Sequence, residues 1–160
     1  MTLNELFQLP PYSLTAPEKE RALSENLSDL TRWHYDNCQE YQRILDPLGY
    51  DSSRRYTCSE LPFIPVRLFK NHELCSVPKE QIVKTLTSSG TSGQAVSKIL
   101  LNADNVRNQS KVLNEIISSF IGKQRLPLLL LDTEVIKKDR SMYSARGAGI
   151  IGFSIFGRNS

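Results

Sequence analysis

Apolar positions in the first part of the chain recur at helical spacing. Leu23, Leu27 and Leu30 follow one another at steps of four and three residues, which places them on one face of a helix. Upstream, Thr15 begins the sequence Thr-Ala-Pro-Glu, which offers an N-cap hydroxyl, an early proline and a glutamate that can complete a capping box. The pattern therefore predicts a helix that begins at Thr15.

A shorter helix and a connector are predicted to follow. The helix spans about residues 38–45 and ends there because Pro47 and Gly49 do not continue it. Residues 50–59 are mostly polar and turn-like. The next segment, 61–70, reads LPFIPVRLFK, and its two prolines argue against both a helix and a central strand. We expect this segment to be extended and partly buried.

Two strand-like runs flank a glycine-containing loop. Residues 82–87 are short, apolar and rich in β-branched side chains, and residues 97–101 have the same character. A third helix is expected to open at Asn102 or Ala103 and to end at Gly122, which can take the left-handed conformation of a helix C-terminus. The local plan is therefore strand, loop, strand, helix.

Two further apolar stretches complete the pattern. Residues 126–131 predict a strand buried on both faces of a parallel sheet, and the small and apolar residues of 141–157 predict a helix packed closely on that sheet. The order is that of an α/β fold. We divide it into a helical lead-in (1–49), an extended connector (50–81) and an α/β part (82–160). Such folds normally have more than three strands, so we expect an incomplete sheet from the front part of a longer protein.

Composition narrows the function classes. The chain has 160 residues, of which 39% are hydrophobic and 23% charged, as expected for a globular domain with a core. The formal charge of +3 is spread along the chain and does not indicate nucleic-acid binding. Cys38, Cys58 and Cys75 show no Cys-x-x-Cys spacing, so neither disulfides nor a zinc site is predicted. The longest apolar run is too short to span a bilayer, and we expect a cytoplasmic location.

The loop between the two predicted strands has the composition of an anion-binding segment. Gly90 and Gly93 allow positive φ angles, through which several backbone N–H groups can point inward. The loop lacks the Gly-Lys-Ser/Thr ending of a Walker A motif and the Gly-x-Gly-x-x-Gly of a dinucleotide fold. Serine-glycine runs are most often flexible linkers, but loops between strands are also where binding sites lie. These two interpretations are about equally supported by the residues alone.

The loop sequence, SSGTSGQ, resembles the Ser/Thr-Gly-rich signature of the adenylate-forming superfamily. Three other segments are similar to one branch of it, the acyl-protein synthetase (LuxE-type) family. They are LPFIPVRLFK at 61–70, the stretch 34–41, and ARGAGIIGF at 145–153. Together these segments cover most of the chain from about His34 to Gly157.

This resemblance implies a fold and an activity. The chain would be part of the large N-terminal domain of an adenylate-forming ligase, which activates a long-chain fatty acid with ATP to an acyl-adenylate and transfers the acyl group to a protein thiol. A fatty-acid reductase, as in bioluminescent bacteria, would be a possible acyl acceptor. The matching loop residues would hold the β- and γ-phosphates of ATP, with Mg²⁺ alongside: Ser88, Ser89, Gly90, Thr91, Ser92 and Gly93.

Departures from the superfamily pattern limit what the resemblance implies. The Pro-Lys pair that usually follows the loop is absent after Gly93, and Lys98 lies four residues beyond Gln94. The later motifs for adenine, ribose and a catalytic lysine have no counterpart before Ser160, so the catalytic residues are unknown and we expect no turnover by this chain alone. An aryl- or acyl-coenzyme A ligase and a non-catalytic partner-binding module of the same fold are the alternatives.

Three other polar residues were candidates for chemistry. Asp132 follows an apolar run, where helix N-caps and ligand-binding carboxylates both occur, and a cap is the favoured interpretation. Arg146 lies between small residues that could hold its guanidinium against a carboxylate or phosphate. His34 is predicted to be a hydrogen-bonded packing residue and not a base.

Overall fold

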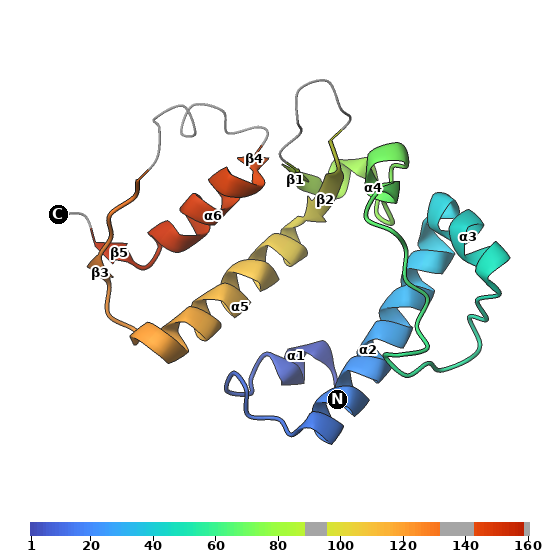
Figure 1. The fold of residues 1–160 in the computed structure, drawn as a ribbon, viewed down its shortest axis with the longest axis horizontal. Helices are drawn as coiled ribbons and strands as arrows, with labels where there is room; N and C mark the ends of the chain where they lie inside the picture. Colours follow the sequence, from blue (N-terminus) through green and yellow to red (C-terminus); the bar gives the residue numbers. More distant parts are fainter. Residues whose placement is uncertain (89–95, 132–142, 159–160) are drawn as a thin grey trace.

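The computed structural model describes residues 1–88, 96–131 and 143–158. Figure 1 shows a helical arm built from the start of the chain on one side, the strands in the middle, and a pair of helices on the other side. The elements are α1 (Leu3–Leu6), α2 (Ala16–Asn37), α3 (Gln39–Leu45), η1 (Asp46–Leu48), α4 (Leu68–Asn71), η2 (Lys79–Gln81), β1 (Ile82–Thr87), β2 (Lys98–Asn102), α5 (Ala103–Ile121), β3 (Leu126–Pro127), β4 (Tyr143–Ser144), α6 (Ala145–Ser154) and β5 (Gly157–Arg158).

Helix α2 begins where its capping sequence predicts. The carboxylate of Glu18 accepts hydrogen bonds from the backbone N–H of Thr15 at 2.9 Å and from its hydroxyl at 2.6 Å. The predicted second helix is also confirmed as α3, which ends in the 3₁₀ turn η1 with Gly49 in the left-handed conformation. The lead-in is therefore helical, whereas the exact division at residues 49 and 81 stays a prediction.

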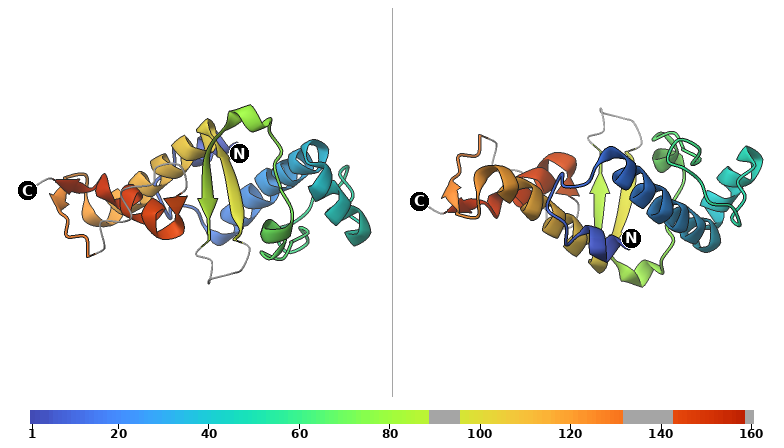
Figure 2. Two further views of the ribbon diagram at one scale, coloured as in Figure 1. Left: turned by 90° about the horizontal axis from the view of Figure 1, so that it is seen from above. Right: turned by 90° about the horizontal axis from the view of Figure 1, so that it is seen from below.

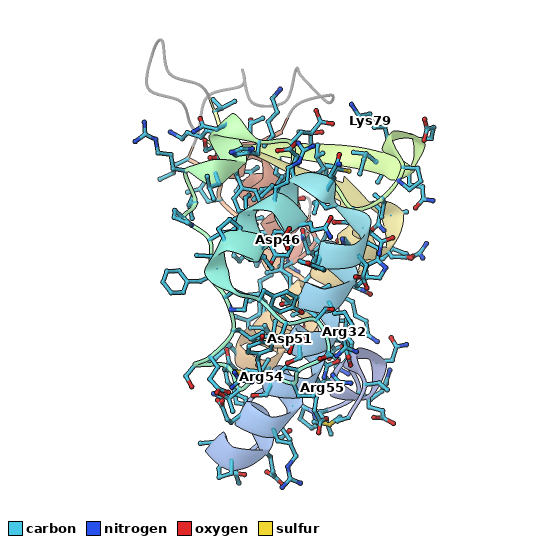
Figure 3. The ribbon with its side chains drawn as sticks, turned by 90° about the vertical axis from the view of Figure 1, so that its right-hand side faces the viewer. Arg32, Asp46, Asp51, Arg54, Arg55 and Lys79 are labelled. Carbon is cyan, nitrogen blue, oxygen red and sulfur yellow. The ribbon has the colours of Figure 1, made fainter. Side chains whose placement is uncertain are left out.

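The connector packs along α2 through polar contacts. Ser28 is buried, and its hydroxyl donates to the carbonyl of Tyr56 at 3.0 Å while accepting from the Tyr56 N–H at 3.1 Å. Arg55 pairs with Asp29 of the same helix at 2.5 Å. In Figure 3, Arg54 and Arg55 lie together beside α2, whereas Lys79 lies at the opposite end of the view. The connector thus follows the helix before it reaches the sheet.

The prediction for residues 61–70 was partly wrong. Its end forms the one-turn helix α4, and the side chain of Phe63 is 86% exposed. The carbonyl of Pro65 accepts the N–H of Leu68 at 2.9 Å, so this proline begins a helical turn that it was expected to prevent. Proline is compatible with the first turn of a helix, where its missing N–H has no partner to lose.

The central sheet has three strands in the order β2-β1-β4. Strand β1 pairs with β2 in antiparallel fashion, with an irregularity between Ile82 and Lys84, and with β4 in parallel fashion. The prediction for residues 82–87 is confirmed without a shift, and β2 begins one residue later than expected. Figure 2 shows β1 and β2 side by side, between the helical lead-in and the α5–α6 pair.

Helix α5 follows β2 without a linker. Asn102 is the last residue of β2 and also the N-cap of α5, where its side-chain oxygen accepts the N–H of Asn105 at 2.9 Å. The helix ends at Gly122, as predicted, and this glycine has a φ of 81° and a ψ of 178°. It packs against β1 and β2, and Leu101 of β2 is only 5% exposed. The part of the hydrophobic core that the sheet contributes therefore lies between α5 and these two strands.

The apolar run 126–131 differs most from its prediction. Only Leu126 and Pro127 are in a strand, which pairs in parallel with β5, and Leu129 and Leu131 are 82% and 88% exposed. The expected buried strand was wrong because a strand becomes buried only when neighbours cover it, and β3 pairs over just two residues. The expected helix in 141–157 is present as the shorter α6, with β4 before it and β5 after it.

The mixture of helices and small sheets agrees with the α/β class in its general sense. Within the parts of the chain that the structure describes, no helix has the length and apolar character needed to cross a membrane.

Candidate functional site

Two serines close the base of the loop between β1 and β2. The backbone N–H of Ser88 donates to the carbonyl of Ser97 at 3.1 Å. In return, the N–H of Ser97 donates to the Ser88 hydroxyl oxygen at 3.0 Å. Ser97 is buried, at 8% exposure. We call these two hydrogen bonds the serine clasp, and it holds the two ends of the loop together.

The serine clasp places one of the six predicted phosphate-binding residues. Ser88 lies at the end of β1, and its hydroxyl oxygen already accepts one hydrogen bond from Ser97, so its hydrogen is the part left to donate to a ligand. Ser89, Gly90, Thr91, Ser92 and Gly93 lie outside the described residues, and their roles stay predictions. Sequence reasoning missed the structural role of Ser88, because nothing in the pattern pairs it with Ser97.

A cavity of about 440 Å³ lies beside the clasp, between α4 and the sheet. Val96 and Lys98, the neighbours of Ser97, line it together with Lys70 of α4. Thr85 and Leu100 are direct partners across the β1–β2 ladder and also line this cavity. Lys70, at the end of the resemblance segment 61–70, therefore lines the same cavity as Val96 and Lys98, which follow the loop in the sequence.

His34 lies in the helical lead-in and is held by packing. One ring nitrogen, Nδ1, lies 2.7 Å from the hydroxyl of Ser76, and the ring meets Trp33 and Tyr41 edge-on. Burial lowers the pKa of His34 below its ordinary value of 6.5, because the charged imidazolium is poorly solvated there. These contacts bear out its interpretation as a hydrogen-bonded packing residue.

The described residues give a limited test of the expected ligands. Among them, no group of three or more His, Cys, Asp and Glu side chains is placed to hold a metal ion. Mg²⁺ commonly uses phosphate oxygens and water with only one or two carboxylates, so this finding does not test the predicted ATP and Mg²⁺, which stay predictions. Asp132 and the side chain of Arg146 lie outside the described residues. Cys38, Cys58 and Cys75 are free thiols, and Cys38 is buried.

Three known proteins that are similar to this chain in sequence are all named as ligases. A long-chain-fatty-acid–luciferin-component ligase of Photorhabdus luminescens is 28% identical over 88 residues, which are 55% of this chain and 75% of that protein. The ligase of the same name from Vibrio harveyi is 25% identical over 88 residues, 23% of its length. A phenylacetate-coenzyme A ligase of Thermus thermophilus is 29% identical over 120 residues, 71% of this chain and 25% of that protein.

The matches differ in how much of each relative they include. The chain spans about a quarter of the length of the V. harveyi and T. thermophilus ligases. The similarity therefore does not by itself assign the activity of those whole proteins to this chain. The sequence profile of the family described as "Acyl-protein synthetase, LuxE" matches residues 3–152, which is nearly the whole chain. The chain therefore belongs to the acyl-protein synthetase (LuxE) family.

Proposed function

We propose that the chain supplies the nucleotide-binding part of an ATP-dependent acyl-protein synthetase that acts on a long-chain fatty acid. Membership of the LuxE family supports this proposal, as do the names of the two luciferin-component ligases. The observation that carries it is the position of the Ser/Gly-rich loop, which joins two paired strands and is closed at its base by the serine clasp. A loop held in this way can present backbone N–H groups and hydroxyls to phosphate oxygens.

The proposed reaction has two steps. First, a carboxylate oxygen of the fatty acid attacks the α-phosphorus of ATP, and the bond from that phosphorus to the bridging oxygen breaks to release pyrophosphate. Second, a protein thiolate attacks the acyl carbon, and AMP leaves with the electron pair of the broken C–O bond. In the first step, Ser88, Ser89, Gly90, Thr91, Ser92 and Gly93 would hold the β- and γ-phosphates of ATP, with Mg²⁺ bound to the nucleotide.

The proposed acyl acceptor and the proposed domain rest on the resemblance to the same family. The acyl acceptor would be a thiol of a partner such as a fatty-acid reductase, and the fold would be part of the large N-terminal domain of adenylate-forming enzymes. The residues that bind adenine and complete the transfer are not assigned in this chain. We therefore propose that the chain needs the rest of such a domain for turnover.

The test is fatty-acid-dependent exchange of pyrophosphate into ATP, measured with the full gene product. Thr91→Ala and Gly93→Ala should reduce the exchange at least about tenfold, because each removes a donor or a conformation that the phosphates need. Gly149→Ala is a matched control, since a Cβ at Gly149 meets no atom of the described residues within 4 Å. Exchange that is absent for every fatty acid tried would refute the ligase proposal, and unchanged exchange in the two variants would refute the loop assignment.

A coenzyme A ligase is the second candidate, because the phenylacetate-coenzyme A ligase matches the largest share of this chain among these three relatives. The acceptor distinguishes the two. With a radiolabelled acid, a synthetase leaves the label on protein, whereas a coenzyme A ligase gives a soluble thioester and needs coenzyme A. A partner-binding module of the same fold would give neither product.

A further inference from the structure

The first segment of the chain lies against α5 and leaves a crevice between them. A cavity of about 440 Å³ lies between residues 6–14, the start of α2 and the middle of α5. Figure 1 shows α1 and the loop after it between α2 and α5. A second cavity, of about 340 Å³, continues along the same segment and shares Phe7, Pro10, Pro11 and Lys111 with the first. The two cavities adjoin, and we call them together the α5 crevice.

Most side chains that line the first cavity are apolar. Residues 6–14 contribute leucine, proline and aromatic side chains, and α5 contributes Val112 and Ile116. Phe7 and Leu14 are half-buried, so part of their surface still faces water. A ligand with an apolar part would remove this surface from water, which favours binding. The volume of the first cavity lies within the range of small-molecule sites.

The α5 crevice also carries positive charge. Lys19 of α2 and Lys111 of α5 line the first cavity, and Lys123 lines the second. Glu115 is the only acid among the described lining residues. None of the three lysines forms an ion pair with another described residue. The amine of Lys111 lies 5.7 Å from the centre of the Phe7 ring, so the charge is held over the apolar lining.

Tyr12 lies at the rim of the α5 crevice in a strained conformation. Its φ is 63°, and it is the only described residue other than glycine with a positive φ. A bulky residue in this conformation is uncommon and is often found where a structure clamps a ligand. The Tyr12 ring is 76% exposed and meets Phe120 of α5 edge-on, with 5.9 Å between the ring centres. This contact ties residues 6–14 to α5.

The α5 crevice is separate from the Ser/Gly-rich loop. It shares no lining residue with the cavity beside the serine clasp. Asn102 lies at the end of β2 away from the loop, and α5 rises about 14 Å along its axis from Asn102 to Lys111. An acid that reacts with ATP at the loop must bring its carboxylate there. An anion paired with Lys111 instead has its charged head in the crevice.

We propose that the α5 crevice is a second binding site, which takes an amphipathic anion with an extended alkyl chain and one negatively charged head. The chain lies on the apolar lining, and Lys19 and Lys111 hold the head. This inference goes beyond the proposed function and does not rest on it. The bound ligand contacts both α5 and the segment before α2, so it ties the helical lead-in to the helix that covers the sheet.

Binding of simple alkyl ions to the chain, measured by isothermal titration calorimetry below their micelle concentrations, tests this site. Decanoate should bind at least about tenfold more tightly than octanoate, because two more methylene groups leave water. Decyl sulfate should behave like decanoate, since a lysine amine recognises the head as a point charge. Decyltrimethylammonium has the same chain with the opposite charge, and should bind at least about tenfold more weakly than decanoate.

Variants of the lysines test where the head binds. Lys111→Met and Lys19→Met keep an apolar side chain and remove the charge, and each should weaken decanoate binding about tenfold. Lys70→Met removes a charge from the cavity beside the serine clasp and should leave the affinity unchanged. Circular dichroism of each variant checks that the fold is retained.

The outcomes separate this inference from the proposed function. If decanoate binds equally well to the Lys111 and Lys19 variants, or no more tightly than octanoate, the site is overturned. In the full gene product, both variants should leave the KM of the fatty acid for pyrophosphate exchange unchanged. A raised KM would place the reacting acid in the crevice and overturn the second site. If exchange is absent with every acid while the lysines control decanoate binding, the synthetase proposal fails and the crevice stands.

Discussion

The segments 82–87 and 126–131 are both predicted to be strands of six residues, yet they have different structures. The first is a complete strand with β2 on one side and β4 on the other. The second has two strand residues, and its last residue is 88% exposed. Apolar composition thus shows that a segment can be a strand, whereas the partners that flank it decide whether it becomes one. The loop of the candidate site follows β1, the segment that has a strand on each side.

The largest expected difference is in core packing, between β2, which pairs with 82–87, and the run 126–131. Leu101→Ala should lower the free energy of unfolding by about 2–5 kcal/mol, because Leu101 is 5% exposed where α5 covers the sheet. Leu129→Ala removes the same atoms from a side chain that is 82% exposed, and should change it by less than about 0.5 kcal/mol. Urea unfolding of both variants measures this. Equal losses would show that β2, the antiparallel partner of 82–87, and the run 126–131 are packed alike.

The serine clasp gives an intermediate effect. Ser88→Ala leaves the N–H of Ser97 without its acceptor at a position that is 8% exposed, and should cost about 1–2 kcal/mol. Ser88→Thr keeps a hydroxyl oxygen and should restore most of this stability. Amide exchange at Ser97, followed by NMR, should quicken in the alanine variant alone. Equal exchange in both variants would mean that the hydroxyl does not hold the loop.

The smallest effect concerns the β3–β5 pair. A Cβ at Gly157 would lie 2.9 Å from the Cβ of Leu128, so Gly157→Ala forces the two segments apart and should cost about 1 kcal/mol locally. The N–H of Leu126, which donates to the carbonyl of Phe156, should then exchange faster. Gly149→Ala, inside α6 and with no described atom within 4 Å of the added Cβ, should instead stabilise by about 0.5–1 kcal/mol. The same sign for both would contradict the packing described at Gly157.

Local signals made much of the fold predictable. The capping sequence at Thr15 fixes the start of α2, and Gly122 fixes the end of α5, because each acts on its own neighbours. Residues 61–70 were misread because prolines exclude helix interiors but allow the start of a turn. The burial of residues 126–131 could not be predicted from their own sequence, because burial depends on which other segments of the chain pack against them.

The candidate site was predicted in the same uneven way. Glycines and hydroxyls between two strands indicated the loop, because composition and position are both local. The serine clasp and the approach of Lys70 to the cavity depend on strand register and on the path of the connector. No sequence pattern predicts the serine clasp or the position of Lys70, so both were found only in the structure.

Asn102 has a mechanical consequence for any enzyme built on this chain. It ends β2 and caps α5 at once, so no loop residue is left between strand and helix to absorb a change of backbone angles. A change of angle between β2 and α5 would therefore have to occur at the ends of these two elements, around Asn102. It would cost the hydrogen bond from the Asn105 N–H to the Asn102 side chain that begins the helix.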